Sequence, residues 1–562
     1  MNELLLSTEN LGFHYARSQK PVLTNINYQH HAGEKILLMG KTGAGKSTLC
    51  FCLKGLIPEI IPGNITGRII FRGNEIKKPA INIGLVLQEF EAQIFNSTVE
   101  LEIAFGLQNL CIPQKVMHEI VHECIKKIGL STYEKISPFS LSGGQKQRLA
   151  IASILAMKPE IFFLDEPMTD LDTEGRAAIC QIIIDFASKD KSILLVDNEL
   201  DNALYFDKIY IMDEGKIIIE DNPENVLLAS DQYTYLGLKP PIRISLFEDL
   251  KLPKRNALRF DDAIESLKKF YPIPAKKPQP PGNPESSQEP LLVFDHVHFQ
   301  YPHSTKGLSD ICLQINKGDF VGLIGANGSG KTTLLKLMIG ILVPSSGTLL
   351  LNNKQPHKIP PEHIPNISGF VFQNPDYQIF TNSISEELIY CLKAAKKNPS
   401  DYRKRIENIL EIVHLHGLQD EDPFLLTKGG RQKVAVASAL INEPELLILD
   451  EPSTGLDYQE QLALLLILQQ LNKEGKTIII TTHSLWIIEE YVNRCIILHN
   501  GTVLTDEPVH RVLSSPELLR QANLEPPELT LLCHKMNLPF MRFNELKAFL
   551  QLLRKHYPPD YL

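Results

Sequence analysis

The chain repeats itself at a constant spacing, and this repeat limits what it can fold into more than any other feature. The stretch GKTGAGKST begins at Gly40, and GANGSGKTT begins at Gly325, 285 positions later. Two further pairs keep this offset: FFLDEP with LILDEP, at Phe162–Pro167 and Leu447–Pro452, and LSGGQKQRLAIAS with LTKGGRQKVAVAS, at Leu141–Ser153 and Leu426–Ser438. Unrelated domains would not hold one spacing over such a length, so the chain contains two copies of one domain.

The length of 562 residues agrees with this interpretation, because so long a chain does not form a single core. Similar tails also follow each copy, RFDDAIESLKKFY from Arg259 and RFNELKAFLQLLRKHY from Arg542. The stretch IPAKKPQPPGNPESSQEP, with six prolines, is typical of a semi-extended spacer. We therefore expect a first domain at 1–238 with an extension at 239–272, a linker at 273–290, a second domain at 291–515 and an extension at 516–562.

Composition excludes several classes of function. The net charge of -9 argues against a nucleic-acid surface, which needs clustered Lys and Arg. The longest strongly apolar run, LALLLILQQL at Leu462–Leu471, is about half of the roughly 20 residues that span a bilayer, so a membrane role requires a partner. No targeting signal is visible, and the nine scattered cysteines do not form a disulfide framework, which favours a reducing, cytoplasmic setting.

Unbroken apolar runs of strand length alternate with longer segments in both halves. They include KILLMG at Lys35–Gly40, FVGLIG at Phe320–Gly325, and the runs IFFLD, LLILD, ILLV and TIIITT. Such runs favour parallel strands that are buried on both faces, whereas half-exposed strands alternate apolar and polar residues. The pattern predicts an α/β fold in each half.

Two of these strands run into glycine-rich loops of the form G-x-x-x-x-G-K-[ST]. Such a loop turns its backbone N–H groups around phosphate, its Lys reaches the β and γ phosphates, and the following Ser or Thr binds Mg²⁺. Two matches, each between an apolar strand and a helix, predict ATP and Mg²⁺ sites. The candidate residues are Gly40, Lys41, Thr42, Gly43, Ala44, Gly45, Lys46, Ser47 and Thr48, and Gly325, Ala326, Asn327, Gly328, Ser329, Gly330, Lys331, Thr332 and Thr333.

An acidic pair follows each phosphate loop by 125 residues, counted from the first loop glycine to the aspartate. Asp165 and Asp450 are expected in the Mg²⁺ shell, and Glu166 and Glu451 are placed to polarise an attacking water. An acidic pair at a strand end is usually a solvated loop, but the same pair downstream of a phosphate loop in both halves favours catalysis.

These motifs together resemble the ATP-binding subunits of ABC transporters. The resemblance rests on LSGGQ before LDEP, on a glutamine after an apolar strand, and on MTDLD or STGLD after the glutamate. It implies tandem P-loop domains of the ABC type, each with a helical subdomain, that pair head to tail so that each ATP lies between one phosphate loop and the LSGGQ loop of the other half. It further implies roles for Gln88 and Gln373 at the metal, with Gln373 also catalytic, for Tyr15 and Tyr301 against adenine, and for Ser142, Gly143, Gly144 and Gln145 at the nucleotide.

A narrower resemblance, to energy-coupling-factor importers of vitamins and transition-metal ions, follows these glutamines. In that family a Q-x-F stretch and a helix dock the membrane subunit, and the matching residues are Gln93 and Phe95, and Gln378 and Phe380. Capping-box spacing at Ser97…Glu100 and Ser383…Glu386 also predicts a helix start. The alternative is that Phe95 and Phe380 are core residues at a helix entry.

The two copies differ at two places. His483, which in the ABC family contacts the γ-phosphate and is expected to be catalytic, corresponds to Asn198 in the first half. Thr427, Lys428, Gly429 and Gly430 replace the Ser, Gly, Gly and Gln of LSGGQ. In the head-to-tail arrangement both changes fall on the ATP site of the first phosphate loop, where together they are expected to slow hydrolysis about a hundredfold or more.

Two other readings of the altered loop remain open. Lys-Gly in place of Gly-Gly resembles a variant tolerated among energy-coupling-factor subunits. Alternatively, a one-residue shift would let Lys428, Gly429 and Gly430 take the place of Ser, Gly and Gly.

The sequence therefore predicts the ATP-hydrolysing subunit of an importer, peripheral on the cytoplasmic face of the cell membrane. Its expected partners are an integral membrane coupling subunit, which contacts the helices after Gln88 and Gln373, and a separate substrate-binding membrane protein. One ATP site is expected to hydrolyse and the other mainly to bind. The alternatives are a tandem ATPase of a sugar or peptide importer, or a soluble ABC protein acting on ribosomes or DNA.

Overall fold

The computed structural model describes residues 3–16, 20–168, 171, 173–187, 191–271, 289–302 and 307–556. The chain divides into two compact units, Met1–Ile244 and Ser245–Leu562, which are described separately. The expected linker at 273–290 lies outside the described residues except for its last two positions, and so do Thr169, Asp170 and Asp172 of MTDLD.

The first unit is built on a six-stranded sheet of order β11-β10-β4-β9-β8-β7. All neighbours are parallel except β10 and β11. Every residue of β8 and β9 is buried, as the unbroken apolar runs predict. The bounds are β4 Lys35–Gly40, β7 Ile83–Val86, β8 Ile161–Asp165, β9 Ser192–Val196, β10 Lys208–Asp213 and β11 Lys216–Asp221.

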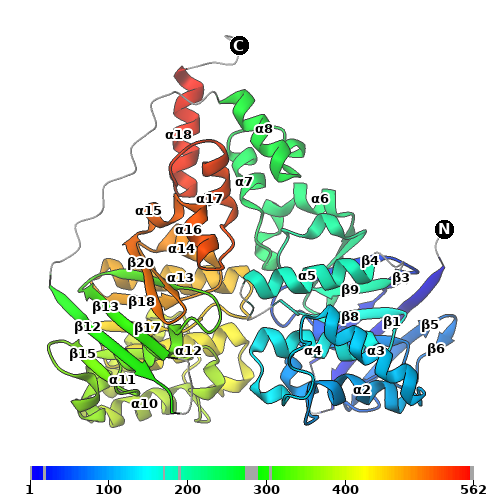
Figure 1. Ribbon diagram of the computed structural model, residues 1–562, viewed down its shortest axis with the longest axis horizontal. Helices are drawn as coiled ribbons and strands as arrows, with labels where there is room; N and C mark the ends of the chain where they lie inside the picture. Colours follow the sequence, from blue (N-terminus) through cyan, green and yellow to red (C-terminus); the bar gives the residue numbers. More distant parts are fainter. Residues whose placement is uncertain are drawn as a thin grey trace. The chain divides into compact units, whose positions relative to one another are not determined.

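A second, antiparallel sheet and several helices complete this unit (Figure 1). Its strands are β1 Leu4–Tyr15, β2 Leu23–Ile26, β3 Gln29–His31, β5 Gly63–Phe71 and β6 Asn74–Glu75. Helix α1 follows the phosphate loop, and α2, α3 and α4 share an apolar cluster that forms a helical subdomain. The helices are α1 Lys46–Lys54, α2 Val99–Asn109, α3 Gln114–Lys127, α4 Gly143–Ala156, α5 Thr173–Ala187 and α6 Pro223–Leu228, with α7 Ile242–Asp249 crossing the boundary of the units.

The second unit repeats this plan, which confirms the predicted tandem α/β fold. Its sheets have the orders β16-β17-β18-β14-β19-β20 and β13-β12-β15. The strands are β12 Pro290–Gln300, β13 Gly307–Asn316, β14 Phe320–Ile324, β15 Ser346–Leu351, β16 Ser368–Val371, β17 Leu446–Leu449, β18 Thr477–Thr481, β19 Arg494–His499 and β20 Thr502–Pro508. The helices are α9 Lys331–Met338, α10 Ile384–Ala394, α11 Tyr402–Ile412, α12 Lys428–Leu440, α13 Tyr458–Lys473 and α14 Leu485–Tyr491.

Short helices follow the second core: α15 Val509–Leu513, α16 Pro516–Gln521, α17 Glu528–Lys535 and α18 Phe543–His556. The tail that the sequence assigns to the first half contains α8 Phe260–Phe270 and contacts α18. On α18, Lys547 lies 2.8 Å from Asp249, and Arg554 donates to the carbonyl of Leu250 at 3.0 Å. Residues 245–271 thus belong to the compact unit of the second half.

The helix starts after the two Gln loops differ from the expectation in one place. Ser383 caps α10 and accepts from the N–H of Glu386, as its spacing predicts. In the first half the cap of α2 is Thr98, which accepts from the N–H of Leu101, so the predicted cap Ser97 is wrong by one position. Either hydroxyl can cap, and a spacing rule does not separate adjacent Ser and Thr. No helix in the described parts of the chain combines the length and apolar character that crossing a membrane requires.

Candidate functional site

Each phosphate loop connects a buried strand to the first turn of a helix. The amine of Lys46 donates to the carbonyls of Gly40 and Lys41 at 2.6 and 3.0 Å. Lys331 does the same with Gly325 and Ala326 at 2.7 and 3.3 Å. Each lysine amine therefore lies beside the loop backbone that would surround a phosphate.

The loop glycines leave space for a phosphate. Gly43 and Gly328 both have φ +80°, and a Cβ added at either would meet nothing within 4 Å. Gly45 and Gly330 cap α1 and α9 in the left-handed conformation, which glycine adopts without strain. The N–H groups of a helix start therefore face an open cradle in each half, as phosphate binding requires.

The first acidic pair ends β8. Asp165 is 1% exposed, and its Oδ1 has no hydrogen-bond partner among the described residues. Burial raises its pKa from 3.8 to about 6, although a hydrogen bond with Ser47 lowers it. Glu166, at φ 47°, lies 4.0 Å from the Lys46 amine and accepts a 3.0 Å hydrogen bond from the amide of Gln88.

The aspartate of the second acidic pair has two hydroxyl donors. Asp450 accepts from Thr332 at 2.9 Å and from Thr481 at 2.7 Å. Burial raises its pKa while these hydroxyl groups lower it, and the net shift is upward. Thr481, on the neighbouring strand β18, corresponds to Val196 in the first half, 285 positions earlier. Sequence reasoning missed this difference, although the alignment of the two halves contains it.

His483 and Asn198 contact different groups. His483 Nε2 lies 3.0 Å from Glu451 Oε1, and its N–H donates to the same carboxylate at 3.2 Å. Burial raises the pKa of Glu451, but the hydrogen bond with His483 and the charges of His483 and Lys331 lower it by more. The net shift of this pKa is downward. Asn198 instead accepts from the N–H of Gly40 at 3.2 Å. In the second half the histidine thus contacts the glutamate, whereas in the first half the asparagine at the same place contacts the phosphate loop.

The structure removes one reading of the altered loop. Ser142 caps α4 and accepts from the N–H three residues on, at Gln145. Thr427 caps α12 and likewise accepts from the N–H three residues on, at Gly430. The two caps are equivalent, so Thr427 stands in the place of Ser142 and the one-residue shift is wrong.

The two loops differ in their side-chain contacts. The Gln145 side chain accepts from the N–H of Ser142 and so completes a capping box. Gly430, at the place of Gln145, has no side chain to form this contact. Thr427 instead donates to Glu460 at 3.0 Å, and a Cβ at Gly429 would collide with that same glutamate. The altered loop is therefore held against α13 by Glu460, a residue that sequence reasoning did not single out.

Lys428 occupies the place of Gly143, and its side chain is half-buried. A Cβ added at Gly455 would lie 2.4 Å from the Lys428 amine, so this side chain lies over the STGLD loop. At Gly143 the same test finds nothing within 4 Å. The second loop thus carries a cation where the first loop is open.

The Q-x-F glutamines hold the Gln loops in position. Gln93 accepts from the N–H of Leu87 at 2.9 Å, and Gln378 accepts from Phe372 at 3.3 Å. Each contacted residue immediately precedes Gln88 or Gln373. Ion pairs also join each Gln loop to the helix of the LSGGQ-type loop, Glu91 with Lys146 at 2.7 Å and Asp376 with Arg431 at 2.6 Å.

Phe95 and Phe380 lie on the surface, 58% and 60% exposed, so their interpretation as core residues is wrong. Each forms an edge-to-face pair at 4.7 Å, Phe95 with Phe105 and Phe380 with Tyr390. Buried carboxylates fix both turns: Glu102 accepts from the N–H of Phe95 at 3.1 Å, and Glu387 accepts from that of Phe380 at 3.2 Å. We call these two pairs the aromatic platforms.

Tyr15 and Tyr301 lie beside the phosphate-loop helices. Their hydroxyl groups lie 3.0 and 3.2 Å from the hydroxyls of Thr48 and Thr333. Tyr301 is 36% exposed, so a ring face remains accessible next to the loop. This position is compatible with the expected contact with adenine.

The donor set fits Mg²⁺. The buried Oδ1 of Asp165 has no hydrogen-bond partner in the described part of the chain, and a hydroxyl group adjoins the carboxylate in each half, at Ser47 and Thr332. Hard oxygen ligands of this kind suit Mg²⁺ that also binds phosphate. Ser47, Gln88, Asp165, Thr332, Gln373 and Asp450 are the residues that would hold it.

Comparison with known proteins gives the same two halves. The profile of the family described as ABC transporter matches residues 23–169 and 308–454. A putative ABC transporter ATP-binding protein of Caldanaerobacter subterraneus subsp. tengcongensis is 36% identical, over 96% of this chain and 97% of its own length.

Two solved structures are also similar. The structure of cbiO1 from Clostridium perfringens, described as part of the ABC transporter complex cbiONQ, is 32% identical and covers 44% of this chain and 100% of its own, with a TM-score of 0.39. A chain in the complex of the archaeal ribosomal stalk protein aP1 and ribosome recycling factor aABCE1 is 21% identical, with a TM-score of 0.57 over 91% of this chain and 92% of its own. The second likeness shows the fold.

We predict that Asp165→Asn stabilises the protein without nucleotide and Mg²⁺. Because burial raises the folded-state pKa from 3.8 to about 6, the folded form binds the extra proton in this window, and stability falls as pH rises through it. Removing the charge should increase the free energy of unfolding at pH 7 by up to about 3 kcal/mol, and by nothing near pH 3. Urea unfolding followed by circular dichroism measures this.

The matched control is Asp450→Asn. Asp450 accepts from two hydroxyl groups, so its substitution should stabilise less than that of Asp165. A variant Asp165→Asn that is less stable than the parent at pH 7 would contradict the proposed cost of burying this charge.

Proposed function

Because the chain belongs to the ABC transporter family and is a tandem ATPase of it, we propose that it energises an importer of the energy-coupling-factor type, for a vitamin or a transition-metal ion. The observation that supports this proposal best is the pair of aromatic platforms. Both platforms follow a Gln loop, and both expose aromatic rings to solvent. Apolar groups exposed together in this way mark surfaces that bind a partner.

Each aromatic platform is exposed and held in a fixed geometry. The buried Glu102 and Glu387 hold the backbone of Phe95 and Phe380 in a turn, and the partner ring comes from the following helix, α2 or α10. Exposed aromatic rings in a fixed geometry are typical anchors of protein interfaces. The proposed occupant is an integral membrane coupling subunit, with a separate membrane protein that binds the substrate.

We further propose that the two ATP sites are unequal. Hydrolysis is assigned to the phosphate loop of the second half, where Glu451 polarises water, His483 orients it, and Gln373 completes the site, opposite Ser142–Gln145 of the first half. Mg²⁺ bound with ATP would neutralise the phosphate charge. The site of the first half, with Glu166, Asn198 and the loop of Thr427, Lys428 and Gly429, is proposed mainly to bind.

Three side-chain differences support the inequality. Asn198 contacts the N–H of Gly40 and not the catalytic glutamate. Val196 cannot donate to Asp165 as Thr481 donates to Asp450. The Lys428 amine lies over Gly455 in the loop that would face the first site. Each loss of about 1.4 kcal/mol in a transition state slows it tenfold, so the changes together account for a large difference.

We predict that Glu451→Gln lowers steady-state ATPase activity of the assembled complex at least about a hundredfold. Glu166→Gln should lower it less than about tenfold, because that site contributes little turnover. A phosphate-release assay measures both variants, and ATP binding to each serves as the control for folding. Equal losses in the two variants would contradict the inequality.

We also predict that Phe95→Ala with Phe380→Ala separates the chain from its membrane partner. Purification from mild-detergent extracts, followed by mass spectrometry, should find a multispanning subunit with the wild type and little with this variant. The matched control is Tyr205→Ala with Leu466→Ala, which removes side chains that are 62% and 57% exposed on other elements. It should retain the subunit, and ATP binding should be equal in all three.

Recovery of ribosomal proteins or DNA-repair factors without membrane proteins would overturn the importer proposal and leave the ATPase activity standing. Recovery of the multispanning subunit would place the chain peripherally on the cytoplasmic face of the membrane, as we propose.

A further inference from the structure

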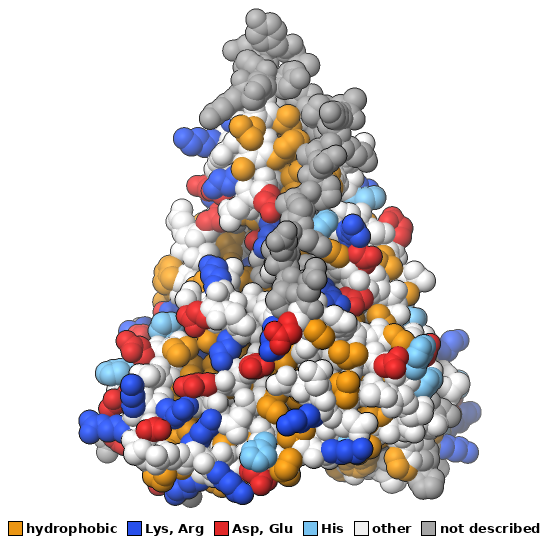
Figure 2. Space-filling model, turned by 90° about the vertical axis from the view of Figure 1, so that its left-hand side faces the viewer, with side chains coloured by type: hydrophobic (Ala, Val, Ile, Leu, Met, Phe, Trp, Pro, Cys, Tyr) orange, Lys and Arg blue, Asp and Glu red, His pale blue; other side chains and the backbone are white. Residues whose placement is uncertain are grey.

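A cluster of side chains of the types that bind metals lies on the antiparallel sheet of the second half. His296 is on β12, and Asp310 and Cys312 are on β13. One ligand atom from each of the three lies within 4.8 Å of the others. Figure 2 faces the side on which β12, β13 and β15 lie in Figure 1, and there histidine side chains lie next to acidic ones at the surface.

A bulge in the sheet brings these residues together. The strand register changes between Phe294, which pairs with Leu313, and Val297, which pairs with Ile311. His296 lies in this irregularity at φ 49°, and Asp310 has φ 52°. Along β13, Ile311 and Leu313 are buried, and successive side chains of a strand point to opposite faces. Asp310 and Cys312 therefore share the exposed face of the sheet.

The distances are close to those of a metal centre. His296 Nδ1 lies 3.5 Å from Cys312 Sγ and 2.6 Å from Asp310 Oδ1. Bonds of about 2.0–2.3 Å in a tetrahedral site separate nitrogen from sulfur by about 3.5 Å and nitrogen from oxygen by about 3.3 Å. The first distance already matches, and the second, a hydrogen bond in the absence of metal, has to open by about 0.7 Å.

The first half shows that the fold does not require these three residues. It has the same bulge, with Asn10 at φ 48° and Asn25 at φ 52°, and an asparagine at 27. There Asn27 accepts from the N–H of Asn10 at 2.9 Å, so amides alone hold the turn. His, Asp and Asn all tolerate the left-handed region, so backbone geometry does not explain an imidazole, a carboxylate and a thiol together.

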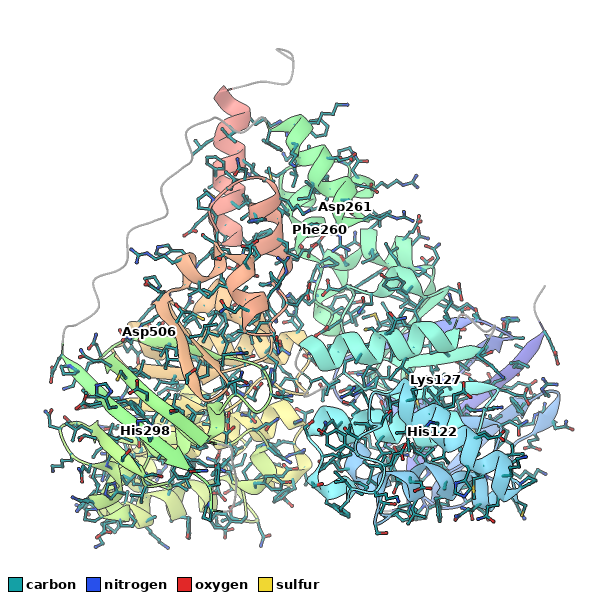
Figure 3. The ribbon with its side chains drawn as sticks, viewed as in Figure 1. His122, Lys127, Phe260, Asp261, His298 and Asp506 are labelled. Carbon is teal, nitrogen blue, oxygen red and sulfur yellow. The ribbon has the colours of Figure 1, made fainter. Side chains whose placement is uncertain are left out.

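A surface hollow and a further histidine lie beside the cluster. Cys312 also lines a hollow of about 500 Å³, together with Asp295, Arg494 and Asp506. His298 lies on the same strand as His296 (Figure 3). Its Nδ1 accepts from the N–H of Asp310 at 3.3 Å. His296 and Asp310 are 71% and 61% exposed. A metal bound to the three residues would therefore keep an open position for water.

We propose that His296, Asp310 and Cys312 form a binding site for a borderline divalent transition-metal ion, of the class of Zn²⁺ and Co²⁺. A thiolate and an imidazole favour these ions, whereas Mg²⁺ and Ca²⁺ prefer oxygen ligands. The site would join β12 to β13, and only in the second half. It is independent of the ATP sites and of the importer proposal.

Co²⁺ tests this site because it reports a bound thiolate by a near-ultraviolet charge-transfer absorption. The full chain, reduced and in excess Mg²⁺ to occupy the ATP sites, is titrated with Co²⁺. We expect one equivalent to bind with this absorption and Zn²⁺ to displace it. Cys312→Ser should abolish the absorption, and His296→Asn or Asp310→Asn should each weaken Co²⁺ binding at least tenfold.

Two controls keep the test decisive. Cys111→Ser removes another exposed thiol and should leave the absorption unchanged. The triple change His296→Asn, Asp310→Asn and Cys312→Asn copies the first half, so it should fold and hydrolyse ATP normally while losing the absorption. No thiolate absorption in the wild type, its persistence in Cys312→Ser, or full Co²⁺ affinity in His296→Asn would each overturn the proposal.

Discussion

Each half depends on a carboxylate buried at the end of a parallel strand beside the phosphate loop. A buried charge has to be compensated by hydrogen bonds or lost by protonation. The strand that lies between the acidic strand and the phosphate-loop strand supplies such a hydrogen bond in one half and not in the other. In the second half that strand ends in Thr481, which donates to Asp450, and in the first it ends in Val196, which has nothing to donate. One side chain on an intervening strand thus changes how well the buried aspartate is compensated.

Duplication makes the two halves internal references for each other. The backbone is repeated, even to the left-handed conformations of Glu166 and Glu451 at φ 47° and 51°. Such conformations persist for a non-glycine residue only where the surroundings impose them. The differences therefore lie in side chains on an equivalent frame, which is why substitution of single residues is informative here.

The sequence predicted the features that follow from spacing and periodicity. Unbroken apolar runs gave parallel buried strands, and glycine spacing gave the phosphate loops, because both patterns reflect local geometry. It could not settle whether Phe95 was buried, since exposure depends on packing between elements that are distant in sequence. It also missed Glu460, whose contact with Thr427 joins residues 33 positions apart. Adjacent Ser97 and Thr98 cap equally well, so that boundary was wrong.

The tie between each Gln loop and the helix that follows the LSGGQ-type loop has a mechanical consequence. Lys146 binds Glu91 in one half, and Arg431 binds Asp376 in the other. In the second half Gln378 also donates to the carbonyl of Ala435 on that helix, whereas Gln93 donates to Leu85 on a strand. Because each Gln loop leads into an aromatic platform, a displacement of the platform would move α4 or α12 with it, and in the second half a hydrogen bond adds to the ion pair that couples them.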